Sequence, residues 1–191
     1  MYIVALNGSP DENGNTQYLL ESILGKLKEK GAECEIINVD KAVSDAKWPF
    51  CINCSTPCSR ACYKDTLLDE AFKKVDKADF VIFGSPVYFG SMSGQLKVFF
   101  DKTRQVRAEK RWLGKPMAAV TVGASKYGGQ ERTVNAIQSS ALVLGMSIIG
   151  NSSDLSMGHF GISAVRPAES DEFAKNAIES LAERIFQEAS R

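Results

Sequence analysis

Four cysteines lie close together in the first third of the chain, in the run Cys51-Ile-Asn-Cys54-Ser-Thr-Pro-Cys58-Ser-Arg-Ala-Cys62. A C-x2-C-x3-C-x3-C spacing lets four thiols converge on one soft metal centre, so an iron–sulfur cluster is the first interpretation. Zinc is an alternative, although zinc sites more often use two C-x2-C pairs with a long spacer. Free or redox-active thiols are the third. The fifth cysteine, Cys34, is expected to be a small buried apolar residue.

Length and composition argue against a disulfide framework for these cysteines. A chain of 191 residues buries about 70% of its unfolded surface and needs no cross-links. The chain enters an apolar segment at Met1–Leu6 without a basic region or cleavage site, and no apolar run approaches the roughly 20 residues of a membrane span. We therefore expect a cytoplasmic protein with reduced thiols. Residues 1–191 would form one domain with a cysteine-rich insertion at about 48–64.

A first glycine-rich loop, Asn7 to Gln17, has the composition of an anion site. Its side-chain donors Ser9, Asn15 and Thr16 stand at the start of a predicted helix, where free N–H groups and the positive end of the helix dipole attract anions. The loop matches neither G-x4-G-K-[ST] nor G-x-G-x-x-G. An ordinary capped loop, with Asn15 or Thr16 as the cap, is the alternative.

Two further glycine-rich loops follow predicted strands. The loop Gly84 to Gly94 places Tyr88 and Phe89 beside glycines, which suits contact with a flat ring; packing of both aromatics in the core is the alternative. The loop Gly123 to Glu131 is also rich in glycine. Because ligands collect outside the carboxyl ends of parallel strands, the three loops together predict one ligand site.

The elements that position these loops alternate along the chain. We expect strands at residues 2–7, 33–39, 80–84, 116–122 and 147–150, and helices at 15–30, 66–77, 91–103, 130–144 and 171–189. Near-continuous apolar strands are typical of a parallel sheet buried on both faces. The alternation predicts a doubly wound α/β sandwich. The long connection after the second strand should open at the same edge as the glycine-rich loops, ordered by its cysteines.

The balance of charged residues argues against some classes of partner, and one basic segment has two possible interpretations. Lys plus Arg and Asp plus Glu number 23 each, so net charge favours neither nucleic acid nor membrane as a partner. Basic residues concentrate between Lys102 and Lys115. A solvated helix end is the simpler interpretation, and a surface for a dinucleotide phosphate or an acidic redox partner is the other. No catalytic side chain is predicted, because the one histidine, His159, has no partner set.

Three motifs together resemble a known family. They are N-G-S-P-x4-N-T at Asn7–Thr16, S-P-V-Y-F-G-S-M-S-G at Ser85–Gly94, and G-G-Q-E at Gly128–Glu131. This combination resembles the NAD(P)H-dependent FMN reductases, and the cysteine run resembles their iron–sulfur flavoprotein branch. The resemblance implies a flavodoxin-like fold with a five-stranded parallel sheet of order 2-1-3-4-5 and helices on both faces.

The resemblance also implies two sets of binding residues. The FMN phosphate would be held by Ser9, Asn15, Thr16 and Gln17. The isoalloxazine ring would be lined by Pro86, Val87, Tyr88, Phe89, Gly90 and Ser91, with Gly123, Gly128 and Gly129 in the loop that closes over it. A [4Fe-4S] cluster, or alternatively zinc, would be held by Cys51, Cys54, Cys58 and Cys62. The branch typically shows C-x2-C-x2-C with a fourth cysteine four to seven residues later, so the departure here concerns the geometry of the cluster.

The expected function follows from these two sites. A protein with FMN and an iron–sulfur cluster would carry electrons between a ferredoxin-like or NAD(P)H donor and an acceptor that the sequence does not identify. One alternative is an NAD(P)H-dependent FMN or quinone reductase without a cluster. Another is a non-catalytic flavodoxin-like binding module with structural zinc. The resemblance further implies a homodimer or homotetramer with FMN near the subunit interface.

Overall fold

The computed structural model describes residues 1–190 and shows strands and helices in alternation. In chain order the elements are β1 (Tyr2–Asn7), α1 (Asn15–Glu29), β2 (Glu33–Asn38), α2 (Val39–Ser44), α3 (Leu67–Lys77), β3 (Phe80–Pro86), α4 (Gly94–Asp101), α5 (Arg104–Ala108), β4 (Pro116–Gly123), α6 (Gln130–Val143), β5 (Ser147–Ile148), β6 (Ile162–Val165), a short 3-10 turn (Ala168–Ser170) and α7 (Glu172–Ala189). The elements predicted from the sequence are all present.

The strands form one parallel sheet of order β2-β1-β3-β4-β5, which confirms the predicted topology. The outer edge of β4 has two partners rather than one. β5 pairs with its start, Pro116–Met117, and β6 pairs in parallel with its end, Val120–Gly123. The fifth position of the sheet is therefore an interrupted strand. β6 was not predicted, because four residues after a polar, glycine-rich stretch carry little periodic signal.

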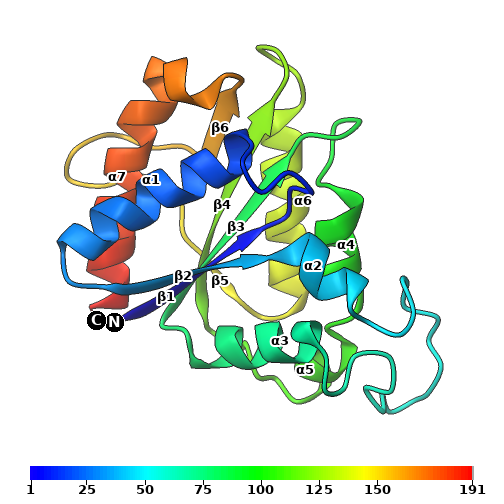
Figure 1. The fold of residues 1–191 in the computed structure, drawn as a ribbon. Helices are drawn as coiled ribbons and strands as arrows, with labels where there is room; N and C mark the ends of the chain where they lie inside the picture. The colour runs from blue at the N-terminus through cyan, green and yellow to red at the C-terminus, as the bar shows by residue number, and fades with distance from the viewer. Residues whose placement is uncertain (191) are drawn as a thin grey trace.

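Helices cover both faces of the sheet, as Figure 1 shows. α1 and α7 pack on one face, over the core that contains Ile3, Ile82 and Val120. α2 to α6 contribute to the core on the other face, which is built around Leu6, Phe83 and Met117. The strand residues alternate between these two cores, as the period of two requires. Both faces are buried, which explains the continuous apolar runs in the sequence.

The start and end of α1 follow from local chemistry. Its buried positions recur at helical spacing, Leu20, Ile23, Leu24 and Leu27. The helix ends at Glu29, and Gly31, just beyond the cap residue Lys30, has a φ of +87°, the left-handed conformation that favours glycine. The N–H of Ala32 donates to the Leu27 carbonyl (3.1 Å), which satisfies a carbonyl at the helix end. The predicted glycine stop of this helix is confirmed.

The cysteine segment does not open directly at the end of β2. The short helix α2 intervenes, capped by Asn38, whose side chain accepts a hydrogen bond from the Lys41 N–H (2.9 Å). Residues 45–66 then run without a regular helix or strand beside α2 and α5 (Figure 1). The connection leaves the sheet at the edge with the glycine-rich loops, because β2 ends at Asn38 opposite Asn7 and Lys41 of α2 forms an ion pair with Glu12 of the first loop (2.6 Å). The cysteines follow only after α2.

The basic segment is only partly a solvated surface. Lys102 is 1% exposed, so a fully solvated segment was a wrong expectation for this residue. Arg111 forms an ion pair with Asp76, and Lys115 donates to the carbonyl of Asp76 (3.3 Å).

Among residues 1–190, no helix has the length and apolar composition needed to cross a bilayer.

Candidate functional site

The first two glycine-rich loops are joined by hydrogen bonds at the carboxyl edge of the sheet. The Gly8 N–H donates to the Gly84 carbonyl (2.8 Å), and the Ser93 hydroxyl donates to the Gly8 carbonyl (2.5 Å). A Cβ at Gly8 would lie 2.8 Å from the Gly84 oxygen, so this close approach requires glycine. Ser93 also caps α4 by accepting from the Leu96 N–H (3.2 Å).

The third loop meets the second loop at the same edge. Gly129 has a φ of +100°, and a Cβ placed there would lie 3.0 Å from the Cα of Gly90. The buried Gln130 side chain donates to the Ser125 carbonyl (2.7 Å) and thereby shapes the third loop. The structure thus brings together the three loops that the sequence assigned to one ligand site. Gln130 belongs to the motif at Gly128–Glu131 but was not predicted as a site residue, because the sequence does not show that its side chain is buried.

The N-terminus of α1 offers unpaired donors. Gly14 occupies the cap position with no side-chain hydrogen bond to the first turn, so the first N–H groups of the helix lack a capping partner. Thr16 is 2% exposed, and its hydroxyl has no hydrogen-bond partner among residues 1–190. These donors are arranged as an anion site requires.

The other predicted phosphate ligands are already bonded within the protein. Asn15 accepts from the Ala168 N–H (2.7 Å), Gln17 accepts from the Asn7 amide (2.8 Å), and Ser9 accepts from the Asp11 N–H (3.1 Å). Asn15 and Gln17 therefore fix the start of α1 in place. Ser9 and Asn15 only accept in these bonds, so the Ser9 hydroxyl and the Asn15 amide can still donate to a phosphate, as can Thr16 and the backbone N–H groups. The Gln17 amide is used, because it donates to Glu21 (2.9 Å).

The aromatic residues of the second loop face solvent. Tyr88 is about half exposed and Phe89 is fully exposed, so the alternative that both belong to the core is wrong. A tight turn presents them: the Tyr88 N–H donates to the Ser91 carbonyl (2.9 Å), and the Ser91 N–H donates back to the Tyr88 carbonyl (3.1 Å). Phe89 and Gly90 both have positive φ, as the centre of a type I′ turn requires.

The rest of the predicted ring lining lies around this turn. Pro86 ends β3, Val87 follows it with its N–H on the Val122 carbonyl (2.9 Å), and Gly123 ends β4. Gly128 and Gly129 complete the third loop, where Tyr127 is almost fully exposed. Tyr127 was not predicted as a site residue, although an aromatic beside glycines in a loop at a strand end is a signal that the sequence offers. The exposed rings of Tyr88, Phe89 and Tyr127 offer apolar surface that a flat ring could contact.

All four clustered cysteines line a single pocket next to Lys102, at the C-terminal end of α4. Six other residues line it with them: Trp48, Phe50, Ile52, Tyr63, Lys102 and Arg104. Cys62 is buried, Cys54 is exposed, and the other two are intermediate. Among residues 1–190, no three Cys, His, Asp or Glu side chains stand close enough to hold a metal ion. The thiols thus share a pocket without forming a closed coordination shell.

The polar groups around the thiols suit an anionic occupant. The Lys102 ammonium is buried and donates to the Trp48 carbonyl (2.8 Å), and Arg104 donates to the Ser55 carbonyl (3.3 Å). The Tyr63 hydroxyl is buried without a partner. Burial raises the pKa of the Cys62 thiol, and the nearby Lys102 partly opposes this rise. Burial, followed by the proximity of Cys58, raises the pKa of Tyr63. Four thiols, a buried cation and an unused donor fit a thiolate-ligated metal centre.

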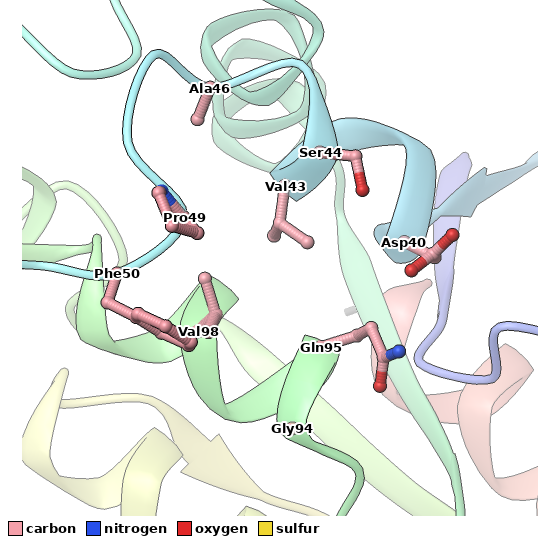
Figure 2. Close-up of a pocket in the computed structure, with 9 residues that line it drawn as sticks. All are labelled: Asp40, Val43, Ser44, Ala46, Pro49, Phe50, Gly94, Gln95 and Val98. Atoms are coloured by element: carbon pink, nitrogen blue, oxygen red, sulfur yellow. The ribbon is translucent and has the colours of Figure 1, made fainter.

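A cavity of about 460 Å³ lies between the two sites. Figure 2 shows its polar residues: Asp40 near the start of α2, Ser44 at the end of α2 and Gln95 near the start of α4. Its apolar end is formed by Pro49, Phe50 and Val98. Because Phe50 also lines the cysteine pocket, one aromatic side chain forms a wall of both spaces.

Comparison with known proteins identifies relatives of the whole chain. The family model described as NADPH-dependent FMN reductase matches residues 1–159. An iron–sulfur flavoprotein of Methanocaldococcus jannaschii is 35% identical over 195 residues, covering 97% of each chain. An iron–sulfur flavoprotein of Methanosarcina thermophila is 30% identical, covering 97% of this chain and 93% of its own. An NAD(P)H dehydrogenase (quinone) of Paracoccus denitrificans is 30% identical over 72% of this chain and 62% of its own.

Solved structures agree on the fold. RosB with a bound flavin-derived intermediate has a TM-score of 0.75 at 13% identity, covering all of this chain and 79% of that one. A WrbA-like flavodoxin from Agrobacterium tumefaciens has a TM-score of 0.67 at 17% identity, covering 99% and 96%. The solved structures show only the fold, whereas the family model and the sequence relatives show the family. The chain belongs to the NADPH-dependent FMN reductase family of flavin-dependent oxidoreductases, in its iron–sulfur flavoprotein branch.

Proposed function

We propose that this chain is an electron-transfer flavoprotein that carries FMN on its three-loop edge and a [4Fe-4S] cluster in its cysteine pocket. It would pass electrons between a ferredoxin-like or NAD(P)H donor and a separate acceptor. The observation that carries the proposal is that all four clustered cysteines line one pocket together with a buried lysine. The names of the relatives from two methanogens, both iron–sulfur flavoproteins, support it.

At the flavin edge the chain's own groups would bind and orient FMN. The Thr16 hydroxyl and the free N–H groups at the start of α1 would bind the phosphate. The type I′ turn holds Tyr88 and Phe89 in exposed positions, and these two side chains would cover the ring. When bound, FMN supplies hydride and single-electron chemistry that no side chain provides. The absence of a predicted catalytic side chain agrees with this division of roles.

At the cysteine pocket the chain would supply four thiolates from Cys51, Cys54, Cys58 and Cys62. Trp48 and Phe50 line the same pocket and would limit the access of water to the centre. Exclusion of water and local hydrogen bonds are the means by which a protein sets the reduction potential of such a centre.

Helix α4 connects the two sites. It begins at Gly94, directly after the second flavin loop, and ends at Asp101, next to the pocket residue Lys102. An eight-residue helix is about 12 Å long at 1.5 Å per residue. This span is short enough for electrons to tunnel between the flavin edge and the cysteine pocket. An electron relay within one subunit is therefore compatible with the fold.

We also propose that the protein assembles as a homodimer or homotetramer through the flavin edge. Phe89 and Tyr127 are almost fully exposed on the second and third loops, and large exposed aromatics are typical of interaction surfaces. Light scattering on the FMN-loaded protein would measure the assembly. A monomer at micromolar concentration would contradict this part of the proposal.

The absorbance spectrum and metal content of anaerobically purified protein test the proposed function. We expect flavin bands with a broad iron–sulfur shoulder, together with iron and acid-labile sulfide. Flavin bands with zinc, or with no metal, would refute the electron relay. That result would favour an NAD(P)H-dependent FMN or quinone reductase, which the likeness to the Paracoccus denitrificans enzyme supports.

A further inference from the structure

Lys102 is a buried cation without a carboxylate partner. It is 1% exposed, and its ammonium donates one hydrogen bond, to the Trp48 carbonyl at 2.8 Å. No ion pair with an acidic side chain involves Lys102 among residues 1–190. Its neighbour on the helix, Asp101, is instead bound to Lys97 (2.6 Å). Lysine is rarely fully buried without a partner, because removing its charge from water is costly.

Tyr63 shows a related feature on the other side of the pocket. It is 1% exposed, its ring packs edge-on against Phe72 (5.1 Å between centroids), and its hydroxyl has no hydrogen-bond partner. A buried hydroxyl without a partner is uncommon and requires an explanation. Tyr63 and Lys102 both line the pocket that contains the four thiols. Two unusual groups, one a cation and one a donor, therefore surround the same small space.

Both features have one physical explanation. A centre held by four thiolates is anionic, and each electron that it accepts adds one negative charge. A buried ammonium nearby stabilises the reduced form more than the oxidised form, because attraction grows with charge and is weakly screened in the interior. A hydroxyl that donates to a cluster sulfur acts in the same direction. Neither effect breaks or forms a covalent bond.

We propose that Lys102 and Tyr63 are positioning residues that raise the reduction potential of the cysteine-held cluster, Lys102 through its charge and Tyr63 through a hydrogen bond to sulfur. This inference rests on the proposed function, because it requires a redox-active centre in the pocket. It assigns a role to two residues that lie outside the cysteine motif and outside the flavin loops.

The test is a potentiometric titration of the cluster in anaerobic holoprotein, followed by electron paramagnetic resonance. We expect K102M to decrease the one-electron reduction equilibrium constant at least tenfold, a shift of about 59 mV to lower potential. Y63F removes one oxygen atom and should shift the potential in the same direction. K102R keeps the charge and should return the potential toward that of the wild type. The matched control is K97M, which removes an exposed lysine from the same helix.

A second readout uses the metal-free protein. There the buried Tyr63 hydroxyl has no hydrogen-bond partner, so Y63F should raise the urea midpoint of unfolding. In the loaded protein Y63F should not raise it. Y63F carries the test should K102M fail to fold.

The outcomes separate the inference from the proposed function. Wild-type protein without iron and acid-labile sulfide would overturn the proposed function, and the inference with it. Wild-type protein with an intact cluster, whose potential changes no more in K102M and Y63F than in K97M, would overturn the inference alone.

Discussion

Replacement of Thr16 by valine tests the phosphate end of the flavin site. The two side chains have nearly the same shape, and Thr16 is buried with its methyl group packed close to Gly84. Valine therefore keeps the packing and removes one donor. A hydrogen bond to a charged group contributes about 1.5–3 kcal/mol, which corresponds to about a 10- to 150-fold change in Kd. We expect the Kd for FMN to be higher in Thr16→Val by this factor.

The assay is a fluorescence titration of apoprotein with FMN and, in parallel, with riboflavin, which lacks the phosphate. Riboflavin affinity should be unchanged in Thr16→Val. The unfolding midpoint of the apoprotein should stay about the same, because the Thr16 hydroxyl makes no hydrogen bond within residues 1–190 that the substitution would break. Ser22→Ala is the control, since this hydroxyl lies further along α1 and donates to the Tyr18 carbonyl (2.8 Å). Unchanged FMN affinity, or an equal loss for both flavins, would refute the placement of the phosphate.

Three other predictions address the ring, the cysteines and the alkaline limit of stability. Phe89→Ala should weaken FMN and riboflavin equally, and unaltered affinity in a flavin titration would remove Phe89 from the ring site. Cys54→Ala should abolish iron content and iron–sulfur absorbance while FMN stays bound, whereas Cys34→Ala should retain both. Burial, and then Glu35, raises the pKa of Tyr2 to about 12. Its contribution to stability is therefore complete below pH 10 and lost as pH rises toward 12, so Tyr2→Phe should flatten this part of a pH–unfolding profile.

The fold was largely predictable, because a parallel sheet buried on both faces leaves long apolar runs. Strands such as β1 and helices such as α1 have strong periodic signals and clear ends. The elements that were missed are short. α2, α5 and β6 have four to six residues, and such segments form because of the tertiary contacts around them.

The candidate site was also predictable only in part. The glycine-rich loops and the cysteines can be recognised in the sequence by residue type and spacing. The sequence could not show that Lys102 is buried, because it lies in a basic segment that resembles a solvated surface. It also could not show that the side chains of Asn15 and Gln17 are bonded within the protein, since their partners Ala168 and Asn7 are set by the fold.

The interrupted edge strand gives the molecule a place where its length can change. β5 and β6 are both attached to β4, so the segment between Ile148 and Ile162 leaves the sheet and returns to the same edge. Lengthening a loop with fixed ends is inexpensive, since each doubling costs about 0.6 kcal/mol. Residues could be added or removed there while Gly123 remains paired with Val165 beside the flavin edge. Additional structure could therefore be inserted at this edge without changes to the three glycine-rich loops or to the cysteine pocket.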